Sequence, residues 1–150
     1  MQTLSKRCRY GLRALYHLTR EYGRGAVPIS QIAAQENIPH KFLEAILLQL
    51  RNRGIVESQK GKKGGYYLAA RPDAITMGSI IRAIDGPLAP LPCASETAFR
   101  RCPECADEQS CETRILMKEV RDAIVAILDQ KTLAQVCEGS LKEGVLRFDI

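Results

Sequence analysis

The sequence predicts a mainly α-helical chain with one small β-hairpin, arranged as a winged helix-turn-helix followed by a long C-terminal helix. Residues 30–53 carry two short helical patterns that are joined by the turn Asn37-Ile38-Pro39. Residues 55–69 carry two β-prone runs around a turn rich in glycine and lysine. Residues 113–130 then form one long amphipathic pattern. Together these three features, in this order, predict the fold class.

The composition limits the class of protein. With 150 residues, the chain is long enough for one domain with an extension. Its net charge of +5 favours a polyanionic partner, and much of the positive charge lies before residue 72. The N-terminus shows no apolar secretion signal, and no apolar run reaches the roughly 18 residues of a bilayer span. We therefore expect a cytoplasmic protein without a membrane partner, in which the six cysteines serve metal or redox chemistry rather than a disulfide framework.

The first helix is predicted over residues 4–22. Its apolar side chains recur at intervals of three and four, which is typical of one buried helix face: Leu4, Cys8, Leu12, Leu15, Leu18 and Tyr22. Basic residues gather at its start, among them Lys6 and Arg13. Such a group is either a solvated face or a set of phosphate contacts. Gly23 and Gly25 are expected to end the helix.

The helix-turn-helix has its own local signals. Ser30 is predicted to cap the first short helix, and the second runs from Pro39 to about Arg53 before Gly54. The buried stripe of the second helix is predicted to be Phe42, Leu43, Ile46, Leu47 and Leu50. Its opposite face carries Lys41, Glu44, Ala45, Leu48 and Asn52, with His40 at the tip. Those side chains suit the base edges of a DNA groove, although an ordinary amphipathic helix would show the same pattern.

The hairpin is predicted from the runs 55–58 and 66–69 around the turn QKGKKGG. Lys60, Lys62 and Lys63 give the turn a cationic tip, and its glycines allow the backbone to approach a phosphate closely. The spacing differs from that of a nucleotide-binding P-loop. A basic hairpin directly after a helix-turn-helix favours the wing of a DNA-binding domain.

The second half of the chain begins with a helix over residues 77–85, capped by Thr76 and ended by Gly86. In the helix at 113–130, the apolar stripe consists of Leu116, Val120, Ile124, Ile127 and Leu128. This stripe is too apolar to face water, so we expect it to pack on its own domain or on a second copy. We divide the chain into a DNA-binding domain (1–86), a sensor region (87–111), a dimerisation helix with a short last helix (112–138) and a tail (139–150).

Four cysteines in the sensor region follow the spacing C-x8-C-x2-C-x5-C from Cys93 to Cys111, and we call residues 93–111 the cysteine loop. Three interpretations are open: an iron–sulfur cluster, tetrahedral zinc, or a metal-free loop that is either a thiol switch or vestigial. The C-x-x-C pair at 102–105 also occurs in thiol oxidoreductases, but those enzymes place it after a strand, and here the preceding sequence is rich in proline. We therefore do not expect an enzyme, and we interpret Cys8 and Cys137 as structural.

The segments LSKRCRYGLRAL, IPHKFLEAILLQLRNRGIVES, KGKKGGYYLA and ITMGSIIRAIDGPLAP resemble the Rrf-type winged-helix transcriptional regulators, the family of IscR-like and NsrR-like proteins. The resemblance implies a homodimer whose long C-terminal helices cross. It also implies that two winged helices read a near-palindromic operator in double-stranded DNA. Many members hold an iron–sulfur cluster in a loop just before the dimer helix, which is where this sequence has its cysteines.

Carried over by position, the resemblance assigns DNA contacts to individual residues. Glu44 would discriminate between sites, and Lys60 would enter the minor groove. The resemblance also implies contacts to the DNA backbone, which would set the position of the protein on the duplex, from Ser30, Gln31, His40 and Lys41. With the basic residues of the first helix and the wing, the predicted DNA-binding set is Lys6, Arg13, Ser30, Gln31, His40, Lys41, Glu44, Lys60, Lys62 and Lys63.

The cysteine loop departs from the C-x5-C-x5-C pattern of IscR-like relatives. The position of their first cysteine is Phe99 here, and Arg114 stands where some relatives have a histidine ligand. We expect the ligands of a [2Fe-2S] or [4Fe-4S] cluster to be Cys93, Cys102, Cys105 and Cys111, with zinc as the alternative metal. The predicted function is transcriptional regulation by DNA binding. The protein would sense iron, redox state or nitric oxide, and the signal would shift the population of arrangements of the two winged helices in the dimer. The alternative is a metal-free regulator of the same fold whose loop is a thiol sensor or a partner-binding site.

Overall fold

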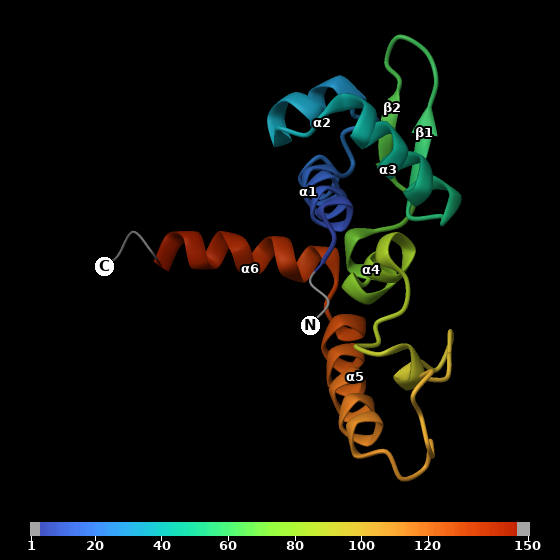
Figure 1. The fold of residues 1–150 in the computed structure, drawn as a ribbon. Helices are drawn as coiled ribbons and strands as arrows, with labels where there is room; N and C mark the ends of the chain where they lie inside the picture. Colours follow the sequence, from blue (N-terminus) through green and yellow to red (C-terminus); the bar gives the residue numbers. More distant parts are fainter. Residues whose placement is uncertain (1–3, 147–150) are drawn as a thin grey trace.

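The computed structural model describes residues 4–146, and it confirms the predicted fold class (Figure 1). The helices in this part of the chain are α1 (Lys6–Arg20), α2 (Ile29–Glu36), α3 (His40–Asn52), α4 (Met77–Asp85), α5 (Glu112–Gln130) and α6 (Leu133–Leu146). Strands β1 (Val56–Gln59) and β2 (Gly65–Leu68) form the hairpin. Two short 3-10 turns lie at Pro72–Ala74 and Pro92–Ala94. Among the described residues, no helix is long and apolar enough to cross a membrane.

Helix α1 lies at the centre of the winged domain and contacts α3, α4 and α6. It begins where the Ser5 hydroxyl accepts a hydrogen bond from the Cys8 N–H at 2.9 Å. Its packing is close at Gly11, where an added Cβ would lie 2.6 Å from Cδ1 of Ile84. The helix is shorter than predicted, because it ends at Arg20, and Leu4 and Tyr22 are exposed outside it.

Helices α2 and α3 form the helix-turn-helix, and Asn37 turns the chain between them in the left-handed region at φ 51°. The predicted cap at Ser30 is wrong. The helix begins at Ile29, two residues earlier than a cap at Ser30 implies, because the carbonyl of Pro28 accepts hydrogen bonds from Gln31 N–H and Ile32 N–H at 3.0 and 3.2 Å. Ser30 is therefore an exposed residue of the first turn.

Four of the five residues that were predicted for the buried stripe of α3 are in the core: Leu43, Ile46, Leu47 and Leu50. The prediction for Phe42 is wrong, because this side chain is 40% exposed. It lies beside the buried stripe and meets Tyr10 of α1 edge to face, with ring centroids 5.6 Å apart. Leu48 is exposed on the opposite face, as the sequence pattern predicted.

The hairpin pairs Val56 with Leu68 and Gln59 with Gly65, so the turn consists of residues 60–64, which we call the wing tip. Val27, in the loop after α1, joins the hairpin through two backbone hydrogen bonds with Tyr66, of 2.8 and 2.9 Å. Gly65 allows this close approach, because a Cβ there would overlap the carbonyl of Val27. Because Tyr66 is the second residue of β2, the hairpin is attached to the body of the domain close to the wing tip.

Helix α4 begins at the predicted cap, where Thr76 accepts from the N–H of Ser79 at 3.2 Å, and it ends at Gly86. Its start is joined to the α5–α6 junction, because Met77 N–H donates to the Lys131 carbonyl at 2.8 Å. Arg82 and Asp129 add a two-pronged ion pair between α4 and α5 at 2.7 and 3.0 Å. These bonds attach the long helix to the winged domain.

Helix α6 runs from Leu133 to Leu146 and is longer than the short last helix that the sequence predicted. Its first turn is anchored in the core by Leu133, which is fully buried. The helix continues beyond residue 138, so the expected boundary of the tail falls inside it, and residues 147–150 of that tail lie outside the described residues. Figure 1 shows α6 projecting away from the body of the molecule.

Candidate nucleic-acid interface and cysteine loop

The outer face of α3 presents the residue types that were predicted to read DNA. His40, Lys41, Glu44, Ala45 and Leu48 are all exposed there. Two of them interact with each other, because His40 Nδ1 and Glu44 Oε1 are 3.4 Å apart, one helical turn along the same face. The face therefore combines acceptors, donors and apolar groups, which is the mixture that base edges require.

The predicted contacts of α1 are organised by an aromatic side chain that the sequence argument did not use. Tyr10 lies between two cations: Lys6 Nζ is 5.6 Å and the Arg13 guanidinium 5.3 Å from its ring centroid. The same ring packs on Phe42, which carries this arrangement over to α3. Lys6 and Arg13 are thereby held beside α3. The signal that could have revealed this was the position of Phe42, which lies at the margin of the apolar stripe.

The wing tip exposes all three of its lysines, Lys60, Lys62 and Lys63. Its tight backbone depends on glycine, because Gly61 has φ +105° and a Cβ on Gly64 would lie 2.5 Å from the Gln59 carbonyl. Strand β1 packs against α3, and Arg51 at the end of α3 donates to the Ser58 hydroxyl at 3.1 Å. These contacts hold strand β1 of the wing against α3.

The remaining predicted contacts lie at the start of α2. Ser30 is exposed and Gln31 is half-buried in its first turn. Helix α2 packs on both α1 and α3, so its first turn is held in place within the winged domain. Backbone N–H groups at a helix start, together with short polar side chains, suit contacts to phosphate.

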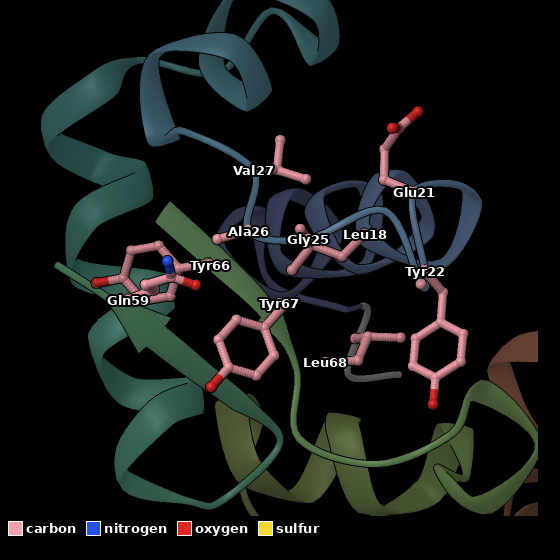
Figure 2. A pocket seen from close by; sticks show the side chains of 11 residues that line it. Leu18, Glu21, Tyr22, Gly25, Ala26, Val27, Gln59, Tyr66, Tyr67 and Leu68 are labelled. Carbon is pink, nitrogen blue, oxygen red and sulfur yellow. The ribbon is translucent and has the colours of Figure 1, made fainter. Parts of the chain in front are cut away.

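A hollow of about 390 Å³ lies where the end of α1 meets the hairpin (Figure 2). Tyr22 reaches it from the turn after α1, and Tyr66 and Tyr67 reach it from β2. A hydrogen bond with Glu57 raises the pKa of the Tyr67 hydroxyl above its ordinary value. None of the predicted DNA-binding or metal-binding residues lines this hollow.

The cysteine loop holds its four thiols apart. Cys93 lies in the 3-10 turn at the start of the loop, and Cys111 is the residue before α5. Cys102 and Cys105 flank one tight turn, in which the Cys105 N–H donates to the Cys102 carbonyl at 3.1 Å. All four are free; Cys102 is exposed and the others are half-buried. Within residues 4–140, whose side chains are described, no three or more His, Cys, Asp or Glu side chains are grouped so as to hold a metal.

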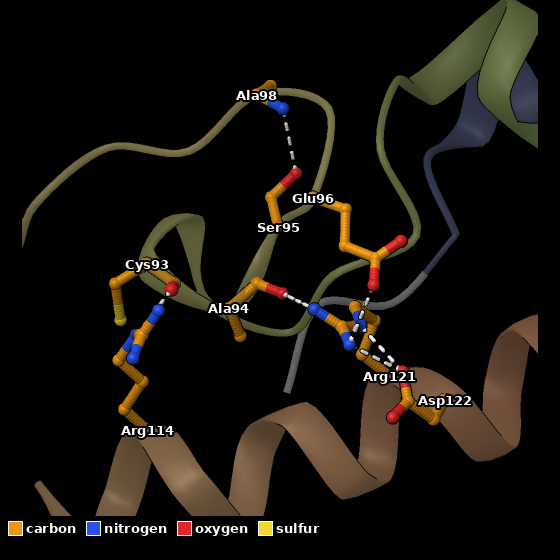
Figure 3. Close-up of polar contacts among 8 residues, drawn as sticks. All are labelled: Cys93, Ala94, Ser95, Glu96, Ala98, Arg114, Arg121 and Asp122. Carbon is orange, nitrogen blue, oxygen red and sulfur yellow. Dashed lines mark hydrogen bonds and ion pairs between the residues drawn. The ribbon is translucent and has the colours of Figure 1, made fainter. Parts of the chain in front are cut away.

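Two arginines of α5 fasten the cysteine loop to that helix (Figure 3). Arg114 donates to the carbonyl of Cys93 at 2.9 Å and to the carbonyl of Glu108 at 3.0 Å. Arg121 is only 8% exposed; it donates to the carbonyl of Ala94 at 2.5 Å and pairs with Glu96 at 3.2 Å. A buried guanidinium requires such partners because its charge has been removed from water. The sequence could not identify this role, since the acceptors are mainly backbone carbonyls far away in the chain.

Further along the loop, Asp107 has a pKa below its ordinary value, because the Ser110 hydroxyl and the Gln109 N–H donate to its carboxylate. The two cysteines outside the loop differ from those within it. Cys8 is fully buried, and burial together with the nearby Asp85 raises its pKa to about 12. Burial also raises the pKa of Cys137. Thiols with raised pKa values are poor nucleophiles at neutral pH, which agrees with structural roles.

The architecture matches known proteins along most of the chain. A family model named Rrf2, described as "Iron-dependent Transcriptional regulator", matches residues 4–139. An rrf2-like HTH-type transcriptional regulator of Rhodobacter capsulatus is 39% identical over 133 residues, which covers 87% of this chain and 89% of the relative. The structure of CymR, the global cysteine regulator of B. subtilis, has a TM-score of 0.76 and 34% identity, covering 92% of this chain and 98% of that one. T. potens IscR has a TM-score of 0.72 and 27% identity, with 93% and 88% covered.

Proposed function

This chain belongs to the Rrf2 family of transcriptional regulators, and we propose that it is a cytoplasmic homodimer that binds a near-palindromic operator under the control of its cysteine loop. The observation that carries the proposal is the exposed face of α3 beside a basic wing tip. A helix of this kind fits the major groove, while a wing can follow the adjacent backbone or minor groove. Selecting binding sites from a randomised DNA pool tests this function directly, and a pool that yields no preferred sequence would contradict it.

The predicted contacts then divide into two roles. Glu44, at the centre of the outer face of α3, would accept from an amino group of a base. Lys41, His40 and the first turn of α2 would hold the helix in register by contacts to the backbone. Lys6 and Arg13, on either side of Tyr10, would contact phosphates beside the same groove. Specificity would therefore depend on few residues and affinity on many.

Replacing Lys62 and Lys63 together with alanine should weaken binding to operator and to random DNA by the same factor. Each lost phosphate contact should reduce the slope of log affinity against log salt by about 0.9. Fluorescence anisotropy at several salt concentrations measures this slope. Lys131→Ala is the matched control, because Lys131 is an exposed lysine at the end of α5. A loss confined to the operator would give these lysines a role in base reading instead.

Replacing Glu44 with alanine should relax base choice at one operator position and leave non-specific affinity nearly unchanged. A well-placed contact to a base edge contributes about 1–3 kcal/mol of discrimination. Site selection with the variant measures the change in preference. Because Glu44 also pairs with His40, His40→Ala should be selected in parallel. Gln35→Ala, on the exposed side of α2, is the control. An unaltered preference in Glu44→Ala would remove Glu44 as a reader.

The cysteine loop fits an iron–sulfur cluster in the kind and number of its donors. Its four thiols are free, and iron–sulfur clusters are commonly held by four cysteine thiolates. The residues that would hold it are Cys93, Cys102, Cys105 and Cys111. When bound, the cluster would supply a charge in the loop that depends on iron and redox state. The family description, which names an iron-dependent regulator, supports this version of the proposal.

Contacts within the chain would transmit a structural change in the cysteine loop to the winged domain. Arg114 and Arg121 connect the loop to α5, and Arg82 connects α5 to α4 through Asp129. Helix α4 packs on α1 and α3, so a displaced loop would alter how the two winged domains are set relative to the dimer helices. Binding to two half-sites depends on their spacing, and a small change in tilt would therefore change affinity.

A metal-free thiol sensor is the second candidate, and one observation favours it. Cys102 is exposed and lies across a single tight turn from Cys105, while the four thiols are not gathered at one centre. Oxidation would then change the shape of the same loop, or of a surface for a partner, without iron. The two versions share the DNA-binding dimer and differ only in the metal content of the purified protein.

A further inference from the structure

A second hollow, of about 410 Å³, lies where the end of α4 meets the segment that leads into the cysteine loop. This is within the size range of small-ligand pockets, about 300–1,000 Å³. Three prolines, Pro87, Pro90 and Pro92, form part of its wall. Proline has no N–H and a fixed φ angle, so this wall is apolar and stiff. A stiff wall loses little conformational freedom when a ligand binds.

Two of the lining residues carry charge, and they have opposite signs. Asp85 is the last residue of α4, whereas Arg100 belongs to the cysteine loop. The carboxylate of Asp85 is oriented by Ser5, which donates both its N–H, at 3.0 Å, and its hydroxyl. A carboxylate has about four acceptor positions, so it can still receive another donor. Arg100 is exposed, and the described residues show no acceptor for its guanidinium.

A third polar group lines the hollow. Ser95 is 7% exposed, and its hydroxyl oxygen accepts from the Ala98 N–H at 3.0 Å (Figure 3). The hydroxyl proton finds no acceptor among the described residues. A buried hydroxyl favours a partner for its proton, and a ligand oxygen would supply one. The hollow thus offers one carboxylate, one guanidinium and one hydroxyl donor around an apolar wall.

We propose that this hollow binds a free α-amino acid with an uncharged, apolar side chain. Its ammonium would pair with Asp85, and its carboxylate would accept from Arg100 and the Ser95 hydroxyl. Its side chain would lie against the prolines and Phe99. An anion or a cation alone would leave one of the two charged residues unmatched, whereas a small zwitterion satisfies both.

Such a ligand would act as an effector because of what its two anchors hold. Asp85 holds Ser5, which caps α1, and α1 packs on the reading helix. Arg100 and Ser95 belong to the segment that Arg121 fastens to α5 through Ala94. A bound amino acid would therefore join the winged domain to the cysteine loop. Its binding can be measured without DNA and without added metal.

The test is titration calorimetry of the full chain without DNA, using each of the standard L-amino acids as the probe. At least one with an apolar side chain should bind. Its amide, which lacks the carboxylate, and its deaminated acid should each bind at least about tenfold more weakly, since a hydrogen bond to a charged group contributes about 1.5–3 kcal/mol. The Arg100→Gln substitution should lower the affinity for the amino acid by a similar factor. Arg101→Gln, the neighbouring arginine that does not line the hollow, should bind it normally.

Arg100 carries the test because it is exposed and its replacement spares the core, whereas a change at Asp85 would also disturb the cap of α1. The proposal is overturned if no amino acid with an apolar side chain binds, if the amide or the acid binds as tightly as the amino acid, or if Arg100→Gln is without effect. These outcomes leave the DNA-binding proposal unaffected, because they are measured on the free protein. Failure of operator binding, in turn, would leave this site intact.

Discussion

Replacing both Leu116 and Ile127 with glutamate is expected to convert the protein from a dimer into a monomer and to lower its operator affinity at least about 100-fold. These side chains of α5 are 54% and 61% exposed, and Ile115 beside them is 49% exposed. Burying one such side chain contributes about 1.5–3 kcal/mol, and a two-fold interface buries each of them twice. Two glutamates per protomer would instead place four negative charges in that interface. A monomer would retain a single half-site and lose the gain from binding two together.

Sedimentation equilibrium measures the assembly, and anisotropy with one-half-site and two-half-site DNA measures its consequence. The matched control is Thr113→Glu with Gln130→Glu, which adds the same charge to exposed polar positions of the same helix. Binding to a single half-site should be equal in both variants. A Leu116→Glu, Ile127→Glu protein that still sediments as a dimer would place the interface elsewhere. A monomer that binds the full operator with normal affinity would show that operator recognition does not require dimerisation.

Replacing Cys105 or Cys111 with serine is expected to remove essentially all iron and visible absorbance from protein purified without oxygen. A serine hydroxyl is a poor substitute for a thiolate, so a cluster held by four cysteines loses one of its ligands. Iron and sulfide counts with an anaerobic absorption spectrum measure the loss. Cys137→Ser is the control, because Cys137 lies in α6, away from the loop.

The same measurements separate the two versions of the sensor. Iron in the unaltered protein together with none in Cys105→Ser supports ligation by the loop. Iron retained in both loop variants would move the ligands to other residues. Unaltered protein that takes up no iron or zinc would leave the thiol sensor, for which reversible modification of Cys102 is the next measurement.

Much of the fold could be predicted because its signals are local. Thr76 and Gly86 set the limits of α4 by capping chemistry that acts within a few residues. The glycines of the wing tip and the β-prone runs around them placed the hairpin to within one residue. The lysines of the wing tip, Glu44 and Lys41 are exposed as expected, because the period of a helix or a turn decides which way a side chain faces.

What could not be predicted depends on partners distant in the chain. Phe42 matches the apolar stripe by type, but Tyr10 of another helix provides its contact at the edge of the core. In the sequence, Arg114 and Arg121 have the pattern of solvent-facing charged residues of α5. Only the folded loop brings the carbonyls of Cys93 and Ala94 to them. The spacing of the cysteines likewise left open whether their thiols would meet, since spacing along an irregular loop does not determine distance in space.

The bond pair between Val27 and Tyr66 has a mechanical consequence for how such a protein could be regulated. It gives the hairpin a third point of attachment, so a movement of the wing away from α3 would have to break these two hydrogen bonds. In the proposed dimer, each winged domain would therefore contact DNA as a single unit. A signal from the cysteine loop would then act on the distance between the two winged domains rather than on the position of one wing.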